Sequence, residues 1–122
     1  MRDYLFRGKT LDGRWHFGDG IYYGPRGVLI TSETETVMVD GKTVGVAIKK
    51  QDINGKEIYT GDIVAVLNDP DGYYQVEYSK MDAKYVLVSD DIEEDFGSYN
   101  NSDLEVIDNI HDNLELPKED TL

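Results

Sequence analysis

The chain has 122 residues, a formal net charge of −13 and no cysteine. This length suits one compact unit with one hydrophobic core, and the lack of cysteine excludes disulfides and thiolate metal sites. No apolar run approaches the roughly 20 residues of a membrane helix, and the N-terminus lacks the apolar core of a signal peptide. We therefore expect a soluble, cytoplasmic protein that does not enter a membrane.

Turn signals divide most of the chain into short segments that favour β-strands. These segments are rich in β-branched and aromatic residues, which is typical of strands. The predicted strands are 4–6, 14–17, 21–23, 28–31, 36–39, 63–67, 73–78 and 85–88. The pattern predicts a mainly β fold, a small antiparallel meander or partly closed β-barrel with extra strands and at most one or two short helices. No linker is evident, so we predict one domain over 1–122, and a two-lobed β arrangement split near 42–51 is the alternative.

The segment 52–64 combines two turns with short apolar strands. Asn54-Gly55 can place both central residues of a turn at positive φ, and residues 58–59 favour a strand. Gly61-Asp62 permits a second reversal, at which the Asp62 carboxylate is expected to bond turn amides. We therefore predict that Asn54, Gly55, Gly61 and Asp62 form a structural signature.

Two later segments are harder to assign. A helical turn is predicted near 89–96. The segment 102–110 begins with the form of a capping box, yet its apolar residues alternate better as a strand that Ile107 interrupts. We favour the strand, and we expect the tail 117–122 to be frayed.

The acidity of the chain is confined to its second part. Residues 1–50 contain eight Lys/Arg and six Asp/Glu, giving +2, whereas residues 51–122 contain four and nineteen, giving −15. Such a surface repels phosphate backbones. It is typical of a solvated face that keeps a protein in solution, or of a docking surface for a basic partner. The acidic run predicted to form a protein-binding surface consists of Asp90, Asp91, Glu93, Glu94 and Asp95.

The sequence contains no recognisable catalytic or metal-binding constellation. His16 and His111 lie far apart in the chain, without thiols or a tight carboxylate spacing to complete a zinc site. There is no serine nucleophile elbow, no P-loop and no calcium-loop pattern. The paired carboxylates of the acidic run are adjacent in sequence that we expect to be flexible, which does not separate their pKa values. We predict a protein without catalytic residues, cofactor or metal.

The N-terminal part offers an alternative function. Arg7, Arg14, Trp15 and neighbouring aromatic residues resemble the stacking surfaces of barrels that bind single-stranded nucleic acid. The basic face is small by the usual criteria, so nucleic-acid binding is the alternative to protein binding. The opposite charges of the two halves, and the sheet edges that small β proteins expose, also favour a homo-oligomer.

Three blocks of the chain resemble the YopX family of phage and prophage proteins. The central block is the run Asn-Gly-Lys-Glu-Ile-Tyr followed by Gly-Asp-Ile-Val at 54–64, and the flanking blocks are 4–15 and 104–116. Their order and spacing cover nearly the whole chain. The resemblance implies a mainly β protein of phage or prophage origin. With the charge split, it leads us to expect a non-catalytic accessory protein that associates with itself or with a host or phage protein.

Overall fold

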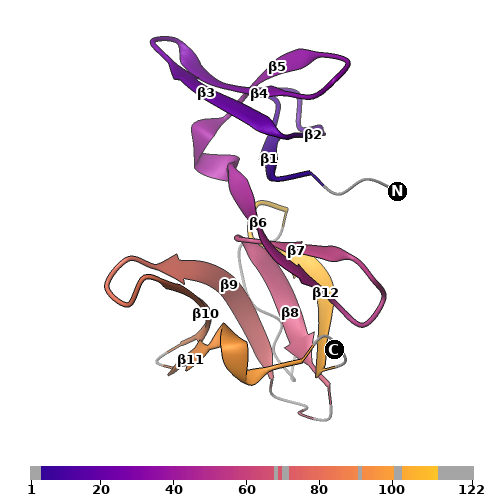
Figure 1. Ribbon diagram of the computed structural model, residues 1–122, viewed down its shortest axis with the longest axis vertical. Helices are drawn as coiled ribbons and strands as arrows, with labels where there is room; N and C mark the ends of the chain where they lie inside the picture. The colour runs from indigo at the N-terminus through magenta and orange to yellow at the C-terminus, as the bar shows by residue number, and fades with distance from the viewer. Residues whose placement is uncertain (1–3, 68, 70–71, 91, 101–102, 113–122) are drawn as a thin grey trace. The chain divides into compact units, whose positions relative to one another are not determined.

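The computed structural model describes residues 4–67, 69, 72–90, 92–100 and 103–112. These residues form a mainly β protein, as predicted (Figure 1). The chain divides into two compact units, Met1–Ala47 and Ile48–Leu122, with the boundary inside the range 42–51. The described chain includes two short 3-10 turns, η1 (Gly41–Thr43) and η2 (Phe96–Ser98). None of the described helical elements is long and apolar enough to cross a membrane.

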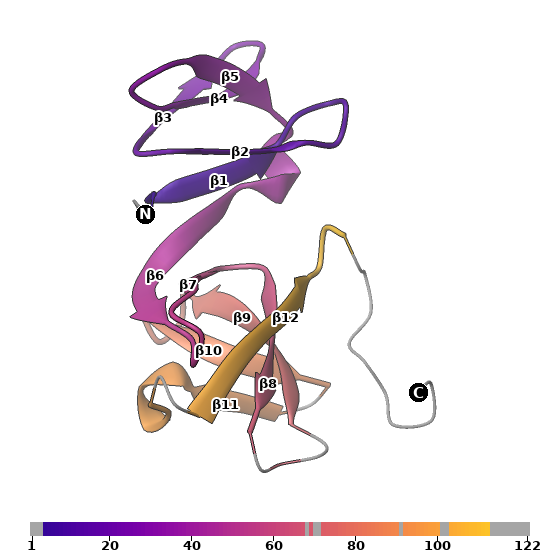
Figure 2. The ribbon, with the colours of Figure 1, turned by 90° about the vertical axis from the view of Figure 1, so that its right-hand side faces the viewer.

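The first unit contains two small antiparallel sheets. One consists of β1 (Phe6–Lys9), β2 (Trp15–Gly18) and the start of β6 (Gly45–Gln51). The other consists of β3 (Gly20–Gly24), β4 (Gly27–Thr31) and β5 (Thr36–Val39), which lie side by side in that order (Figures 1 and 2). Its buried core is formed by Val28, Ile30 and Val39, against which Phe6, Ile21 and Val44 pack.

Two glycines allow strands of the two sheets to approach closely in this unit. A Cβ atom on Gly18 would overlap the carbonyl oxygen of Thr31, and one on Gly8 would lie 2.7 Å from Cγ2 of Val39. Next to the first contact, the N–H of Asp19 donates a hydrogen bond to the Thr31 carbonyl at 3.1 Å. The strands lie close together at these two points, because the backbone at each glycine packs directly against a residue of the other sheet.

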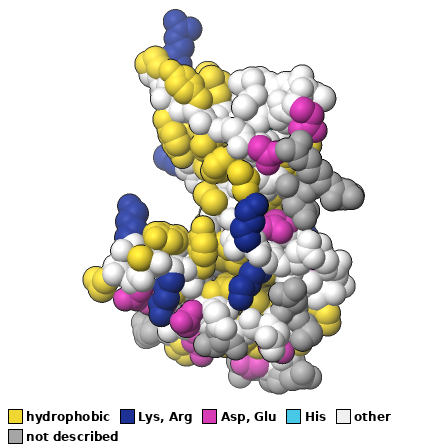
Figure 3. All heavy atoms as spheres, in the orientation of Figure 1, with side chains coloured by type: hydrophobic (Ala, Val, Ile, Leu, Met, Phe, Trp, Pro, Cys, Tyr) yellow, Lys and Arg dark blue, Asp and Glu magenta, His cyan; other side chains and the backbone are white. Residues whose placement is uncertain are grey.

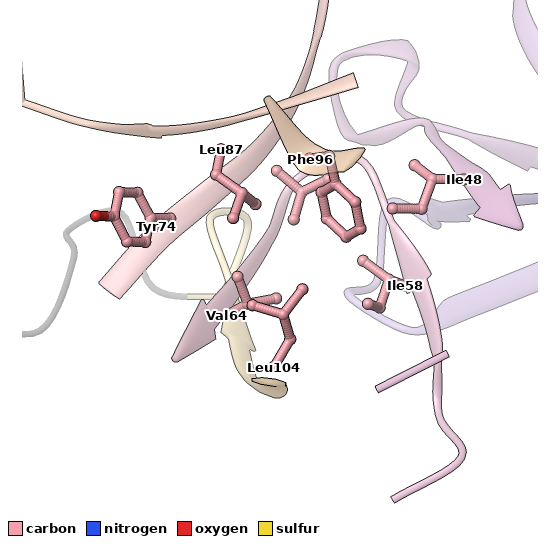
Figure 4. Packing of buried hydrophobic residues seen from close by; sticks show 8 residues of the cluster. Ile48, Ile58, Val64, Tyr74, Leu87, Phe96 and Leu104 are labelled. Carbon is pink, nitrogen blue, oxygen red and sulfur yellow. The ribbon is translucent and has the colours of Figure 1, made fainter. Parts of the chain in front are cut away.

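The second unit is built around a five-stranded antiparallel sheet in the order β11-β10-β9-β8-β12. Its strands are β8 (Asp62–Val66), β9 (Tyr73–Ser79), β10 (Lys84–Ser89), β11 (Ile92–Asp95) and β12 (Leu104–Asn109). The end of β6 pairs with the short strand β7 (Glu57–Tyr59). Side chains from these elements and from η2 converge on one core, shown in Figure 4, which consists of Ile48, Ile58, Val64, Tyr74, Val76, Leu87, Phe96 and Leu104.

The last described strand confirms the alternation seen in the sequence. β12 pairs with β8, and its register shifts between Val106 and Asp108. Ile107 is therefore the extra residue of a bulge, and 40% of its surface is exposed. The bulge lies where the sequence predicted that Ile107 interrupts the strand, because an inserted residue breaks the two-residue period of the side chains.

Other expectations were wrong in detail. The segment 89–96 does not hold the predicted helical turn, because residues 92–95 pair with β10 as β11 and the 3-10 turn begins at Phe96. The first strand begins at Phe6, not at residue 4. Strand β6 was not predicted at all, and its alternation is broken by Lys49, which has φ 66°. The tail 117–122 lies outside the described residues.

Candidate protein-binding surface

A buried aspartate that the sequence analysis did not single out holds the central signature in place. Asp52 is 3% exposed, and one of its carboxylate oxygens accepts hydrogen bonds from the amides of Asn54 and Lys56, both at 2.9 Å. The other oxygen accepts the amide of Val106 on β12, also at 2.9 Å. The carboxylate thus joins a local turn to a strand 54 residues later in the chain. Three amide donors satisfy it, so its role is structural.

The turn itself differs from the one that was predicted. Gly55 has φ 80°, but Asn54 does not have a positive φ. The amide of Gly55 donates to the Asp52 carbonyl at 3.0 Å, and the amide of Asp52 donates to the Lys56 carbonyl at 2.8 Å. These bonds define a three-residue hairpin loop in which one glycine is left-handed, a common alternative to the two-residue loop expected for Asn-Gly. The longer loop brings two amides onto the Asp52 carboxylate.

The second turn of the signature places another carboxylate in the interior. Gly61 has φ 92°, which favours glycine at this position. Asp62 is 1% exposed, and its carboxylate accepts the amide of Tyr59 at 2.8 Å. Asp62 therefore bonds a turn amide at the entry to β8. Both turn carboxylates are buried and accept hydrogen bonds from backbone amides, so they position the strands that flank the two turns.

The acidic run lies mainly on β11, an edge strand of the five-stranded sheet. Pairing with β10 sets Glu94 opposite Leu87 on the core face, and it sets Glu93 and Asp95 on the other face. Glu94 is half-buried and accepts a hydrogen bond from the Tyr99 hydroxyl. This bond, together with burial, raises the pKa of Tyr99. Asp91 lies outside the described residues.

The solvent-facing carboxylates of the run share their face of the sheet with a carboxylate on β9, beyond the intervening strand β10. Glu93 and Asp95 are exposed, as is Asp90 in the turn that precedes β11. Glu77 on β9 shares their face, because Glu77 and Asp95 both pair with Val86 of the strand between them. We call Glu77, Asp90, Glu93 and Asp95 the acidic edge. The register thus removes Glu94 from the predicted surface and adds Glu77, which lies outside the continuous acidic run of the sequence.

Asp95 also has a local structural role, which makes its contribution dependent on pH. It accepts the amide of Gly97 at 2.9 Å, which caps η2, and lies 3.3 Å from Nζ of Lys84. The Gly97 bond first, and then Lys84, lower the pKa of the Asp95 carboxyl below its ordinary value. A depressed carboxyl pKa stabilises the fold above the unfolded-state pKa, and this stabilisation is lost as the pH falls through the lower folded-state value.

We therefore expect Asp95→Asn to be less stable than the natural protein at neutral pH. Thermal unfolding followed by circular dichroism should show the difference in melting temperature shrinking as the pH falls from about 4, the unfolded-state pKa, through the lower folded-state pKa, below which both states protonate the carboxyl. The exposed neighbour Glu93→Gln serves as the control and should show no comparable pH-dependent difference. A difference for Asp95→Asn that stays constant down to acid would contradict the capping role.

The residues of the predicted nucleic-acid surface are brought together only in part. Arg7 is 6% exposed, and its guanidinium lies 4.8 Å from the centre of the Trp15 ring. Nζ of Lys9 lies 5.7 Å from the same centre. Arg14 is exposed, and its Nε lies 3.0 Å from the Asp12 carboxylate. The Trp15 ring therefore contacts the protein's own cations, and Arg14 has an acidic neighbour.

The histidines and acidic groups do not assemble into a metal site within the described ranges. Nε2 of His16 lies 3.1 Å from the Ile30 carbonyl oxygen, and its Nδ1 lies 3.9 Å from the Glu35 carboxylate. His111 is half-buried, with a ring atom that would lie 3.4 Å from a Cβ on Gly61. The two histidines thus contact different parts of the chain.

The described residues thus form two small antiparallel β units, and Asp52 and Asp62 are buried at turns of the second unit. The fold places the chain among all-β proteins. Residues 28–118 match the family model described as "YopX protein", and the chain belongs to this family. The match contains the central signature and the acidic edge. Among curated proteins and solved structures, none matches the chain.

Proposed function

We propose that this protein is a non-catalytic, cytoplasmic accessory protein of phage or prophage origin that binds a basic protein partner through the acidic edge. The observation that carries the proposal is the position of three exposed carboxylates on one face of an edge region of the sheet. Glu77, Glu93 and Asp95 share that face, while Lys84 is the basic residue that the register places among them. Opposite charge on a partner would steer association and fix its orientation.

The wider charge distribution supports the same proposal. The second part of the chain carries −15, and this excess repels nucleic acid and attracts cationic surfaces over about 10 Å at ordinary salt.

The test compares two variants of the tagged protein that change the net charge equally. The first neutralises the acidic edge by Glu77→Gln, Asp90→Asn and Glu93→Gln, leaving Asp95 to cap η2. The control neutralises three acidic residues of the first unit by Asp12→Asn, Glu33→Gln and Glu35→Gln. Each protein is used to capture partners from host lysate with and without nuclease, at low and high salt, and recovered proteins are identified by mass spectrometry.

We expect to recover a specific partner protein whether or not nuclease is added. The acidic-edge variant should lose this partner, and the control variant should retain it. Its recovery should fall with rising salt, since exposed charges are screened. Equal recovery by both variants would overturn the acidic-edge proposal. Recovery that nuclease abolishes would instead favour single-stranded nucleic-acid binding through the region of Arg7, Arg14 and Trp15.

A further inference from the structure

The sheet formed by β3, β4 and β5 has apolar side chains on both of its faces. The inner face supplies Val28, Ile30 and Val39 to the core of the first unit. On the outer face, Tyr22, Leu29 and Met38 form one cross-strand row, because Leu29 pairs with both of the other residues. Tyr22 is 59% exposed and Met38 is 42% exposed, and Leu29 is half-buried.

The strand residues on the outer face carry no charge. None of the residues in the three strands is charged, and the positions that flank the row are occupied by glycines and threonines. Gly27 lies beside Met38 on this face, since the Met38 Sδ would be 3.6 Å from a Cβ at that position. Exposed hydrophobic side chains also gather over the β3–β4 end of this unit in Figure 3. A contiguous exposed apolar face of this kind marks an interaction site.

The charge distribution favours a second copy over a charged partner as the occupant of this face. Two copies with a net charge of −13 repel each other, and the excess lies entirely in residues 51–122. Residues 1–50 carry only +2, and the sheet face itself is neutral. Contact between two copies through this face therefore buries apolar surface without desolvating a charge. A partner recognised through charge would find nothing on this face to pair with.

The row is also complementary to itself. A two-fold axis that runs parallel to β4 beneath Leu29 exchanges the strands on either side of it. That operation sets Leu29 against Leu29 of the second copy, and it sets Tyr22 of each copy against Met38 of the other. Thioether and aromatic groups make favourable contacts.

We propose that the outer face of the β3-β4-β5 sheet is a homodimer interface, formed with a second copy of this chain. The sheet measures about 14 by 17 Å, so the dimer buries less than the roughly 1,200 Å² of a standard stable interface. The dimer is accordingly weak and depends on protein concentration. This inference concerns the first unit and is independent of the acidic edge.

The experiment is sedimentation equilibrium of the full chain over a wide range of protein concentrations, at low and high salt. We expect a monomer–dimer equilibrium that salt strengthens, because salt screens the repulsion between copies. Salt weakens binding at the acidic edge, so the two interactions respond in opposite directions. The acidic-edge variant described above should dimerise at least as well as the natural protein.

Three single variants, each adding one positive charge, locate the interface. Tyr22→Lys and Met38→Lys should each weaken dimerisation by about tenfold or more, because a lysine would be desolvated in the contact. Dimerisation should weaken even though the added positive charge reduces the repulsion between the two acidic copies. Tyr78→Lys is the control, since Tyr78 is 49% exposed on β9 in the second unit, and it should leave the equilibrium unchanged or slightly strengthened.

Circular dichroism melting of each variant establishes that the monomer is folded, and two interface variants are used so that one folding failure leaves the test intact. A protein that is monomeric at every concentration and salt would overturn the proposal. So would equal weakening by Tyr22→Lys and Tyr78→Lys, because the contact would then not be specific to the outer face.

Discussion

Replacing Asp52 with alanine should destabilise the second unit by about 3–5 kcal/mol, because three amides lose their charged acceptor at a buried position. The donors are the amides of Asn54, Lys56 and Val106, each 2.9 Å from the Asp52 carboxylate. Chemical denaturation followed by circular dichroism measures the loss. Hydrogen exchange should show that the amide of Val106 becomes labile.

Two further variants separate the effect of Asp52 from a general loss of acidity. Asp52→Asn keeps one acceptor oxygen and should retain part of the stability, since one amide would then face an NH₂ group. Asp82→Ala removes an exposed carboxylate from the β9–β10 turn and should change stability by about 0.5 kcal/mol or less. Equal losses in Asp52→Ala and Asp82→Ala would show that the buried bonds contribute nothing specific.

Replacing Gly18 with alanine should destabilise the first unit by about 2–3 kcal/mol or more. The added Cβ would overlap the carbonyl oxygen of Thr31, and backbone cannot move aside as a flexible side chain can. Trp15 is the single tryptophan of the chain and begins β2, the strand that Gly18 ends, so its fluorescence reports the unfolding of this unit. We expect the midpoint of the fluorescence transition to fall to a lower concentration of denaturant.

Gly24→Ala is the matched control for Gly18→Ala. A Cβ at Gly24 would have its nearest neighbour at 3.6 Å, which is ordinary contact, and the substitution makes the same chemical change. Its Trp15 transition should remain close to that of the natural protein. If both alanines shifted the midpoint equally, the cause would be the loss of glycine and not the close approach of the strands.

The sequence predicted most of the strands because their signals are local. Turn residues such as Gly55 and Gly61 adopt positive φ wherever the chain reverses tightly, and both do so here. β-Branched and aromatic runs between the turns then had few alternatives to strand. The interruption at Ile107 was likewise readable, because a bulge changes the period of side chains within a single strand.

The exposure of side chains in the acidic run could not be predicted from local sequence. Glu93 and Glu94 are adjacent and chemically alike, yet one is exposed and the other is half-buried against Tyr99. Their difference comes from the register of β11 on β10, and a shift by one residue would exchange them. Pairing also turned a segment expected to be partly helical into an edge strand, and it added Glu77 from another strand to the candidate surface.

By itself, the sequence determined the β class, the positions of most turns, the family and the charge difference between the two parts of the chain. These properties depend on neighbouring residues or on simple counts. The tertiary structure alone decided that Asp52 is tied to Val106, that the acidic edge has one solvent-facing side and that Tyr22 and Met38 share an exposed apolar face. The reason is physical, since those features arise from pairing between strands, and strand pairing depends on contacts between residues that are distant in the chain.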